Sequence, residues 1–425
     1  MLDAAIPALL RRFIGPLVQR GELAIALPGG EKLVFGDGTA PRAHIRFTDR
    51  TAVVAMLRDP DLQFGELFMD QRLRVEEGTV YDVLELLLRD DRDVPPNAFV
   101  RMLDAWRMRL RPVLQHNLPG KSRANVAHHY DLDDRLYELF LDAGRQYSCA
   151  YFERGDEDLE TAQRAKQRHI AAKLLVEPHH RVLDIGCGWG GMARYLAGVA
   201  GAAHVTGITL SQEQLAHARR LGEDTAFADR LDYRLEDYRH TPGRFERIVS
   251  VGMFEHVGVG FYDTFFQRCR QLLTDDGVML LHFIGNSDVP DFNNPWIEKY
   301  IFPGGHIPSL SECTPAIERS GLVVTDIEVL RLHYARTLRL WRERFMARRA
   351  EAAALYDERF CRMWEFYLSM SEAAFRFQEI AIFQIQLAVR QENVPLTRDY
   401  VAVREKALRL REAALEVAAE VPETA

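Results

Sequence analysis

The segment that most constrains the fold of this chain runs from Arg181 to Gly191, with the sequence Arg-Val-Leu-Asp-Ile-Gly-Cys-Gly-Trp-Gly-Gly. An apolar run, Val182 to Ile185, leads into a glycine-rich turn, and the residues from Met192 onward have a helical pattern. Glycine is favoured where the backbone takes a positive φ or where a ligand lies against the main chain. A helix N-terminus also offers unpaired N–H groups to a polar ligand. The segment therefore predicts a strand, a tight turn and a helix that together bind a nucleotide-like ligand.

The residues after this turn alternate between short apolar strands and helical patterns. Strands are expected at 204–209, 231–235, 247–251, 278–284 and 322–329, and helices at 211–222, 260–273 and 314–320. Such alternation predicts an α/β fold with a parallel, doubly wound sheet and helices on both faces. Ligands of these sheets bind beyond the carboxyl ends of the strands. The glycine turn, Thr209, Asp237, Glu255 and His282 are therefore expected to face one crevice.

The end of the second strand distinguishes between possible nucleotides. An NAD site needs an acid there, but the sequence is Thr209-Leu210-Ser211, and the glycine spacing departs from GxGxxG. Asp184 stands two residues before the first glycine and completes the pattern Asp-x-Gly-x-Gly-x-Gly, which is typical of enzymes that use S-adenosylmethionine (SAM). Ser211 and Gln214 also match a capping box, and this leaves a ligand role for Gln214 open.

Composition and charge narrow the function classes. The net charge of −8 argues against a nucleic-acid partner, because nucleic-acid binders usually carry a basic surplus. Basic stretches at 101–123 and 331–349 are solvated faces by default, and they also suit lipid phosphates. The five scattered cysteines lack metal-ligand spacing, so no metal site is expected. No apolar run is long enough to span a bilayer, which predicts a cytoplasmic protein with peripheral contact at the inner face of the membrane.

Several longer motifs resemble one family. They are Tyr147-Ser-Cys-Ala-Tyr-Phe, Leu183-Asp-Ile-Gly-Cys-Gly-Trp-Gly-Gly, Gly207-Ile-Thr-Leu-Ser, Arg247-Ile-Val-Ser-Val-Gly-Met-Phe-Glu-His-Val-Gly and Trp296-Ile-Glu-Lys-Tyr-Ile-Phe-Pro-Gly-Gly. Together they resemble the cyclopropane-fatty-acyl-phospholipid synthase family, which includes the mycolic acid cyclopropane synthases. The resemblance covers roughly residues 50–400, and the segment 69–76 matches the bacterial branch, which has an extra N-terminal domain.

The resemblance implies a class I SAM-methyltransferase fold, SAM as the methyl donor, an unsaturated phospholipid acyl chain as the acceptor, and a bound bicarbonate ion. Carried over by motif, the bicarbonate ligands are the main chains of Cys149 and Ile284 and the side chains of Glu255, His282 and Tyr334. The residues implied for the cofactor are Tyr147, Ser148, Asp184, Gly186, Gly188, Thr209, Leu210, Gln214, Glu236 and Asp237.

The implied chemistry suits these residue types. An alkene is a weak nucleophile that takes a methyl group only from a strong electrophile such as a sulfonium, and the resulting carbocation is stabilised by aromatic faces. Ring closure then needs a base near the added methyl group. Gln378-Glu379 replaces glycines that are usual in the family, so a methyl- or methylene-branched product remains an alternative. A non-catalytic lipid-binding protein on the same fold is the alternative from a different class, and a nucleic-acid methyltransferase is disfavoured.

The same reasoning gives a domain organisation. Residues 1–95 are predicted to form an α+β domain for lipid association or dimerisation, with a helix at 1–20, three short antiparallel strands within 23–47 and further helices. A basic linker helix at 96–125, a catalytic domain at 126–405 and a polar tail at 406–425 follow. The insertion 286–312 and helices within 352–390 are expected to form a lid over an acyl tunnel. The apolar run Phe375–Leu387 is either a wall of that tunnel or ordinary core. A homodimer is expected.

Overall fold

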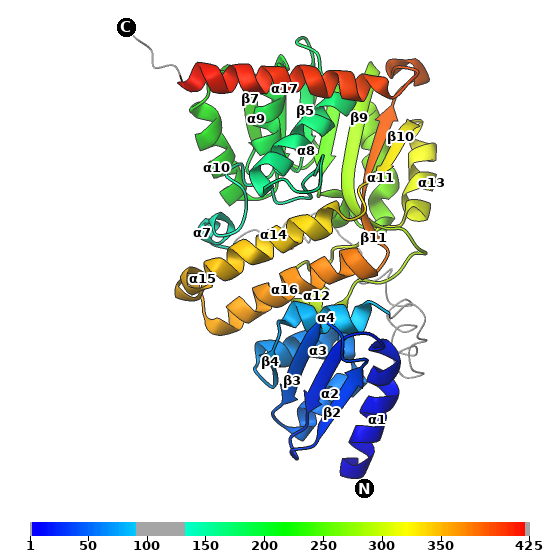
Figure 1. The fold of residues 1–425 in the computed structure, drawn as a ribbon. Coiled ribbons are helices and arrows are strands. Elements are labelled where there is room, and N and C mark those ends of the chain that lie inside the picture. Colours follow the sequence, from blue (N-terminus) through cyan, green and yellow to red (C-terminus); the bar gives the residue numbers. More distant parts are fainter. Residues whose placement is uncertain (1, 91–131, 421–425) are drawn as a thin grey trace. The chain divides into compact units, whose positions relative to one another are not determined.

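The computed structural model describes residues 2–90 and 132–420 (Figure 1). Its contacts divide the chain into two units. Unit 1 comprises Met1–Leu114, Asp291–Pro303 and Ala335–Ile380, and unit 2 comprises Gln115–Pro290, Gly304–Tyr334 and Ala381–Ala425. The predicted basic linker at 96–125 lies outside the described residues.

Unit 1 is built on a four-stranded sheet with the order β2-β1-β3-β4. Its strands are β1 (Glu22–Ala26), β2 (Lys32–Gly36), β3 (Arg42–Phe47) and β4 (Leu73–Glu77). The hairpin of β1 and β2 is antiparallel, as predicted, but β3 lies on the far side of β1 and is parallel to it. The prediction of three antiparallel strands was wrong at this point, because the turn at 37–41 carries the chain across β1 instead of folding it back on β2. The sequence prediction also missed β4, which pairs with β3.

The helices of unit 1 come from three separate parts of the sequence. Its elements are α1 (Leu2–Leu17), α2 (Arg50–Arg58), α3 (Pro60–Met69), α4 (Val80–Leu88), α12 (Pro295–Tyr300), α15 (Arg349–Leu355), α16 (Glu358–Phe377) and nearly all of α14 (His333–Ala347). Helix α16 packs on α3 and α4, and α12 packs on α3. Trp296 meets Phe366 edge to face at 4.7 Å, and Gly65 leaves room for the Trp296 ring where a Cβ would collide with it. Part of the predicted lid thus forms the core of unit 1.

Unit 2 is built on a seven-stranded sheet with the order β10-β11-β9-β8-β5-β6-β7. The strands are β5 (Arg181–Ile185), β6 (His204–Thr209), β7 (Leu231–Leu235), β8 (Phe245–Val251), β9 (Leu273–Asn286), β10 (Val323–Val329) and β11 (Ile380–Ala388). The five strands from β9 to β7 are parallel to one another, and β10 is antiparallel to β11. The predicted doubly wound α/β sheet is confirmed.

Two hydrophobic cores cover the two faces of this sheet. One contains α11 (Tyr262–Leu272) and α13 (Leu310–Ser320). The other contains α8 (Leu159–Lys173), α9 (Gly191–Gly198) and α10 (Gln212–Glu223). The short α7 (Asp134–Glu138) precedes α8.

Strand β11 corrects one prediction. Helices were expected throughout 352–390, but α16 ends at Phe377 and residues 380–388 join the sheet of unit 2. The run Ile-Ala-Ile-Phe-Gln-Ile-Gln-Leu-Ala is rich in β-branched and aromatic residues, which favour a strand. Phe383, Ile385 and Leu387 are buried in the core with α11 and α13. For β11, the apolar run is therefore ordinary core, and the C-terminal helical extension is interrupted by a strand.

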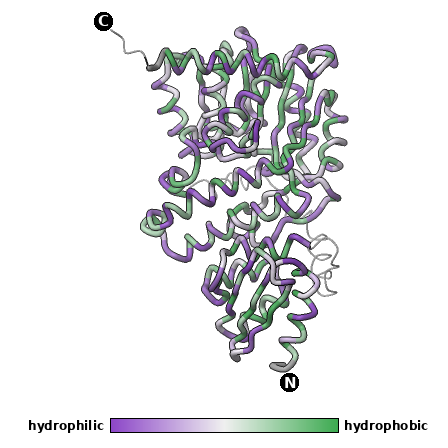
Figure 2. Tube along the Cα trace, in the orientation of Figure 1, coloured by the Kyte–Doolittle hydropathy of each residue, from purple (hydrophilic) through white to green (hydrophobic). Residues whose placement is uncertain are grey.

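The prediction of a polar tail at 406–425 also differs from the structure. Helix α17 (Asp399–Glu420) spans the predicted boundary at 405/406 and packs on α8. Hydrophilic and hydrophobic residues alternate along it (Figure 2), and Leu408 is buried in the core with α8 and α9. Glu412 is also buried and pairs with Arg168 of α8. Up to Glu420 the predicted polar tail is therefore part of the folded unit.

Candidate active site

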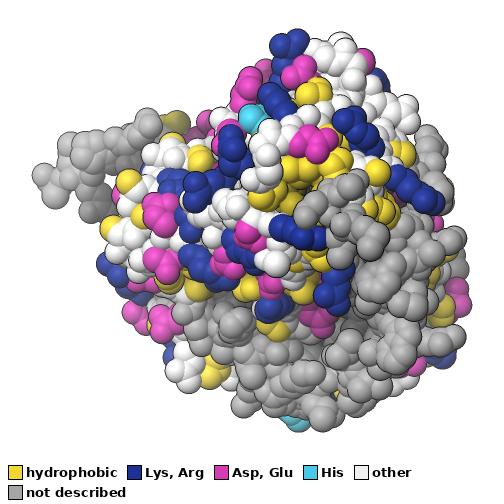
Figure 3. Space-filling view, turned by 90° about the horizontal axis from the view of Figure 1, so that it is seen from below, with side chains coloured by type: hydrophobic (Ala, Val, Ile, Leu, Met, Phe, Trp, Pro, Cys, Tyr) yellow, Lys and Arg dark blue, Asp and Glu magenta, His cyan; other side chains and the backbone are white. Residues whose placement is uncertain are grey.

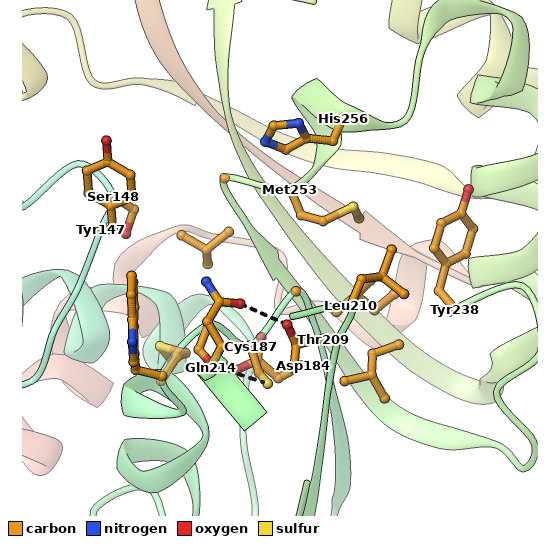
Figure 4. A pocket seen from close by; sticks show the side chains of 18 of the residues that line it. Tyr147, Ser148, Asp184, Cys187, Thr209, Leu210, Gln214, Tyr238, Met253 and His256 are labelled. Carbon is orange, nitrogen blue, oxygen red and sulfur yellow. Dashed lines mark hydrogen bonds between the residues drawn. The ribbon is translucent and has the colours of Figure 1, made fainter. Parts of the chain in front are cut away.

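A cavity lies in unit 2 where β5, β6, β7 and β8 end. All ten residues predicted to hold the cofactor line it. They are Tyr147, Ser148, Asp184, Gly186, Gly188, Thr209, Leu210, Gln214, Glu236 and Asp237. Tyr147 and Ser148 lie on one side, Met253 and His256 lie across from them, and Gln214, Thr209 and Asp184 lie between (Figure 4). The crevice expected at the carboxyl ends of the strands is present.

The glycine turn follows β5 and forms part of the cavity lining. Gly186 has φ +80° and Gly190 has φ +78°, which side chains rarely allow. A Cβ on Gly186 would lie 2.8 Å from Met253, and a Cβ on Gly190 would lie 2.7 Å from the Tyr233 hydroxyl. That hydroxyl donates to the carbonyl of Gly190 at 3.2 Å. Both the conformation and the packing of the turn therefore require these glycines.

Gln214 is held at the start of α10 by two contacts. The Ser211 hydroxyl accepts from the backbone N–H of Gln214 at 3.3 Å, which caps the helix. The Gln214 side chain does not complete the predicted capping box, because its Oε1 accepts from the Thr209 hydroxyl at 2.8 Å (Figure 4). Thr209 and Gln214 are thus linked to each other within the cavity lining.

Asp184 is buried at the end of β5 and lines the cavity. Within the described part of the chain its Oδ2 has no hydrogen-bond partner. Burial raises the pKa of this carboxyl to about 7, and the nearby Lys166 opposes that shift. An unpartnered carboxyl oxygen of this kind suits a donor group on a ligand.

The acids after β7 differ in their contacts. Asp237 accepts from Arg239 Nε at 2.8 Å and Nη2 at 2.5 Å. Glu236 Oε1 is buried and has no partner among the described residues. Of the two, Glu236 therefore has the oxygen that remains open to a ligand.

A buried lysine supports the loop that carries Tyr147 and Ser148. Lys166 of α8 is fully buried and donates to Gln146 Oε1 at 2.6 Å and to Ser148 Oγ at 2.9 Å. Gln163, one turn earlier, donates to the carbonyls of Gln146 and Ser148. Burial lowers the pKa of Lys166 to about 8. Sequence reasoning missed this role, although polar residues three apart on a helix beside the glycine turn are a signal that could have suggested it.

Glu255 and Ile284 lie together next to the end of the sheet. Glu255 Oε1 accepts from the backbone N–H of Ile284 at 2.6 Å, whereas Glu255 Oε2 is buried and unpartnered within the described residues. Burial raises the pKa of Glu255 to about 7, while the hydrogen bond from Ile284 opposes the shift. The N–H of Ile284 is therefore already used by Glu255.

His282 lies in β9, two residues before Ile284, and is fully buried. Its Nδ1 lies 3.1 Å from Gln384 Nε2, and its Nε2 has no partner among the described residues. Burial holds the pKa of the ring well below its usual range. Cys149 and Tyr334 are also buried, Cys149 after the Tyr147 loop and Tyr334 in the first turn of α14. None of the five residues predicted to hold bicarbonate lines the cavity described above, and their gathering around one anion stays a prediction.

The cavity lining also includes residues that sequence reasoning did not select. They include Arg145, Gln146, Trp189, Met192, Tyr238, Arg239, Met253, His256 and Val257. Burial lowers the pKa of His256 to about 4, so this ring is neutral. Within residues 2–90 and 132–420, no group of three or more His, Cys, Asp and Glu side chains is arranged to hold a metal ion. In the same ranges, no helix combines the length and the apolar character that crossing a membrane requires.

Comparisons with known proteins agree on the kind of fold and chemistry. The model of the mycolic acid cyclopropane synthetase family matches residues 119–385. The cyclopropane-fatty-acyl-phospholipid synthase of Escherichia coli K12 is 38% identical over 361 residues, which cover 84% of this chain and 90% of that protein. A tuberculostearic acid methyltransferase of Mycobacterium tuberculosis is 35% identical over 377 residues, covering 83% and 86% of the two chains. The solved structure of the mycolic acid cyclopropane synthase CmaA1 with SAH and CTAB has a TM-score of 0.59 at 35% identity, covering 62% of this chain and 97% of that one.

Proposed function

Because the chain belongs to the mycolic acid cyclopropane synthetase family, whose members use SAM, we propose that it converts the cis double bond of an unsaturated phospholipid acyl chain into a cyclopropane ring. The observation that carries the proposal is the cavity at the glycine turn, whose lining contains every residue selected for SAM. Such a reaction needs a binding site for the donor and polar groups that can hold a base. Glu255 Oε2 and His282 Nε2 are buried and have no partner among the described residues.

In this proposal different residues of the cavity bind different parts of SAM. Glu236 Oε1 is open to the ribose or adenine, and the Asp184 carboxyl is open to the amino acid end of SAM. Thr209 and Gln214, joined by their hydrogen bond, form another part of the lining. Holding the sulfonium close to the acceptor makes the reaction effectively unimolecular, which is a main source of rate.

The reaction balances without an oxidant. The π electrons of the alkene form a bond to the methyl carbon of SAM, the carbon–sulfur bond breaks, and S-adenosylhomocysteine (SAH) leaves. One alkene carbon becomes a carbocation. Loss of a proton from the added methyl group then lets its C–H electrons close the third side of the ring. The proton must go to a base that does not itself attack the cation.

The buried polar groups beyond the cavity fit a small anion that carries a hydroxyl group. Glu255 Oε2 has no partner within residues 2–90 and 132–420 and can accept from such a hydroxyl, and His282 Nε2 can donate to an anionic oxygen. Bicarbonate has both features, and when bound it would supply the base for the methyl proton. Glu255, His282 and Tyr334, with the main chains of Cys149 and Ile284, would hold it.

A second product is supported by a specific observation. One relative is named a tuberculostearic acid methyltransferase at 35% identity, and Gln378-Glu379 stands where the family usually has glycines. If the proton leaves from a carbon of the chain, the product is a methyl-branched acyl chain that keeps a double bond. If a hydride first shifts from the methylated carbon to the cationic carbon, loss of a proton from the methyl group gives a methylene branch instead. The donor site and the first step are the same for both products.

The deciding experiment is incubation of the full chain with SAM and vesicles of a cis-unsaturated phospholipid. Mass spectrometry should show acyl chains heavier by one CH₂, and proton NMR should show the upfield signals of cyclopropane ring protons. Vinylidene or methyl-branch signals would replace the cyclopropane proposal with the branched product. Unchanged SAM and lipid would reject catalysis and favour a non-catalytic lipid-binding protein.

We also propose peripheral membrane association and a homodimer. Hydrophobic side chains gather beside Lys and Arg side chains on one face of the molecule, with acidic side chains among them (Figure 3). Cations near an anionic surface contribute about 1 kcal/mol each, and this attraction weakens as salt screens it. Co-sedimentation with anionic vesicles at low and high salt tests membrane association, and light scattering of the free protein tests the dimer. An equal affinity for neutral vesicles would count against an electrostatic contribution to membrane binding.

A further inference from the structure

A chain of buried polar contacts leads from α8 through β11 to His282. Lys173 Nζ lies 2.9 Å from Gln384 Oε1, and Gln384 Nε2 lies 3.1 Å from His282 Nδ1. All three side chains are almost fully buried, and all belong to unit 2. The donor and acceptor types in this chain permit only one arrangement of protons.

The lysine fixes the orientation of the glutamine amide. An ammonium group has donors only, so the amide atom that faces Lys173 must be the carbonyl oxygen. The NH₂ group of Gln384 then points toward His282, and it can only donate. His282 Nδ1 must therefore accept, which means that it carries no proton.

The histidine is consequently neutral, with its single proton on Nε2. Burial and the nearby cations Lys166, Lys173 and His169 hold the pKa of His282 well below its usual range, so a second proton is disfavoured. Nε2 is the buried ring atom that lacks a partner within the described part of the chain. It therefore presents an N–H donor at the position where an acceptor would sit.

The lysine is itself held by an outer network. Lys173 also donates to Glu328 of β10, and Glu328 Oε2 lies 2.7 Å from His169 Nε2. His169 Nδ1 lies 2.6 Å from Glu405 of α17. The Tyr151 ring stacks on His169 with the ring centroids 4.2 Å apart. Burial lowers the pKa of Lys173, and the contact with Glu328 opposes that shift. The network therefore favours the ammonium form and holds it in place.

We infer that Lys173 and Gln384 are positioning residues that lock His282 as the Nε2–H tautomer, so that His282 donates a hydrogen bond to the reaction's anion and cannot act as its base. The inference rests on the proposed function for its effect on turnover, but the tautomer exists in the free protein. It goes beyond that function by assigning the direction of the hydrogen bond at His282 and by excluding one candidate base.

The first test is made on the free protein without substrate, and it does not depend on the activity of any variant. The full chain is labelled with ¹⁵N-histidine, and long-range proton–nitrogen correlation reports which ring nitrogen carries the proton. The His282 signal is assigned by its loss in the His282→Gln variant. Protonated Nε2 with bare Nδ1 is expected. A proton on Nδ1, alone or together with one on Nε2, would overturn the inference.

The second test reverses the tautomer with little change of shape. In Gln384→Glu, the carboxylate can accept from both Lys173 and His282, so the proton is expected to move to Nδ1. The kcat should fall by about 100-fold or more, as for other enzymes whose histidine is held in the wrong tautomer, with KM for SAM within about twofold. Gln386→Glu is the matched control, because Gln386 is equally buried in β11 and bonds the Lys173 carbonyl and the Tyr400 hydroxyl.

The outcomes separate the inference from the proposed function. SAH affinity close to that of the unmodified protein shows that each variant is folded. An unshifted tautomer in Gln384→Glu, or a shifted tautomer with unchanged kcat, would overturn the inference. If the unmodified protein forms no cyclopropane, the proposed function fails. The tautomer measured in the free protein still tests the inference about His282.

Discussion

Burial of the Glu255 carboxyl links its protonation to folding. Its pKa is raised from 4.5 to about 7 in the folded chain, so between these values the folded state keeps a proton that the unfolded state has lost. The free energy of unfolding therefore falls as pH rises through this range, and this fall is complete above pH 7. The shift corresponds to about 3 kcal/mol.

The corresponding prediction concerns stability without ligand. In Glu255→Gln, the amide cannot ionise, so the stability of the variant relative to the unmodified protein should rise by up to about 3 kcal/mol between pH 5 and pH 8. Chemical denaturation at the two pH values measures this difference. Asp184→Asn is the matched comparison, because the Asp184 carboxyl is also buried with its pKa raised to about 7. A difference that does not depend on pH would show that Glu255 is already ionised in the fold.

The same substitution should separate catalysis from donor binding. Glu255 does not line the cavity that contains the predicted SAM residues, so Glu255→Gln should lower kcat by about 100-fold with SAH affinity nearly unchanged. Turnover assays and calorimetric titration with SAH measure the two effects. A large loss of SAH affinity would assign Glu255 to the donor site instead.

Sequence reasoning selected the residues that line the cavity but not the ones that hold them in place. The glycine turn and the strand ends follow from local patterns, and the predicted positions do line the cavity. Lys166 and Gln384 were missed because their roles depend on partners about 20 and 100 residues away. A buried lysine in a helical pattern looks like an ordinary exposed lysine until the helix packing on it is known.

At the level of elements, α8 supports the loop that lines the donor site. Lys166→Met removes two hydrogen bonds from a charged donor, to Gln146 and Ser148, and such bonds are worth about 1.5–3 kcal/mol each. SAH affinity should therefore fall tenfold or more, while kcat at saturating SAM stays close to normal. Titration and steady-state kinetics measure this, with the exposed Arg164→Met on the same helix as the control. Unchanged affinity would mean that the loop is held by other contacts.

The pairing of α17 with α8 offers a matched test of buried and exposed ion pairs. Glu412 is buried against Arg168 and also accepts from the Tyr195 hydroxyl at 2.5 Å, whereas Glu416 and Arg164 are both about half exposed. Glu412→Ala should destabilise the protein by up to about 3 kcal/mol, because among the described residues it leaves the buried Arg168 charge with only its longer 3.4 Å contact to Glu153. Glu416→Ala should cost less than about 1 kcal/mol. Equal effects in denaturant titrations would contradict the burial of α17.

Each element that sequence patterns predicted wrongly has a physical reason for the error. Strand β11 follows directly after a long helix, and its apolar run fits a buried helix as well as a buried strand. The parallel pairing of β1 and β3 depends on where the chain crosses the sheet, which no local pattern encodes. The boundary at 405/406 rested on composition, but the buried stripe of α17 is narrow, and the many charged residues around it hide it.

At the scale of the whole molecule, the division of the chain does not follow the sequence order. Segments 291–303 and 335–380, which were assigned to the catalytic domain, share a unit with the N-terminal sheet. The predicted lid over an acyl tunnel, the lipid-binding role of the N-terminal domain and the dimer all depend on how larger parts meet, and they stay predictions. Adjacency in sequence is a weak guide to long-range packing when a chain leaves a unit and returns to it.

The division into units leads to a last prediction about cooperativity. The donor cavity lies wholly in unit 2, whereas Trp296, Trp341 and Trp364 are fully buried in unit 1. SAH at 100 times its Kd stabilises the state that binds it by about 2.7 kcal/mol, so the calorimetric transition of unit 2 should rise by roughly 5–10 °C. Tryptophan fluorescence reports on both units, because Trp189 lines the donor cavity, and its component from unit 1 should keep its midpoint. An equal shift of both signals would mean that the two units unfold as one, because a ligand stabilises only what unfolds together with its site.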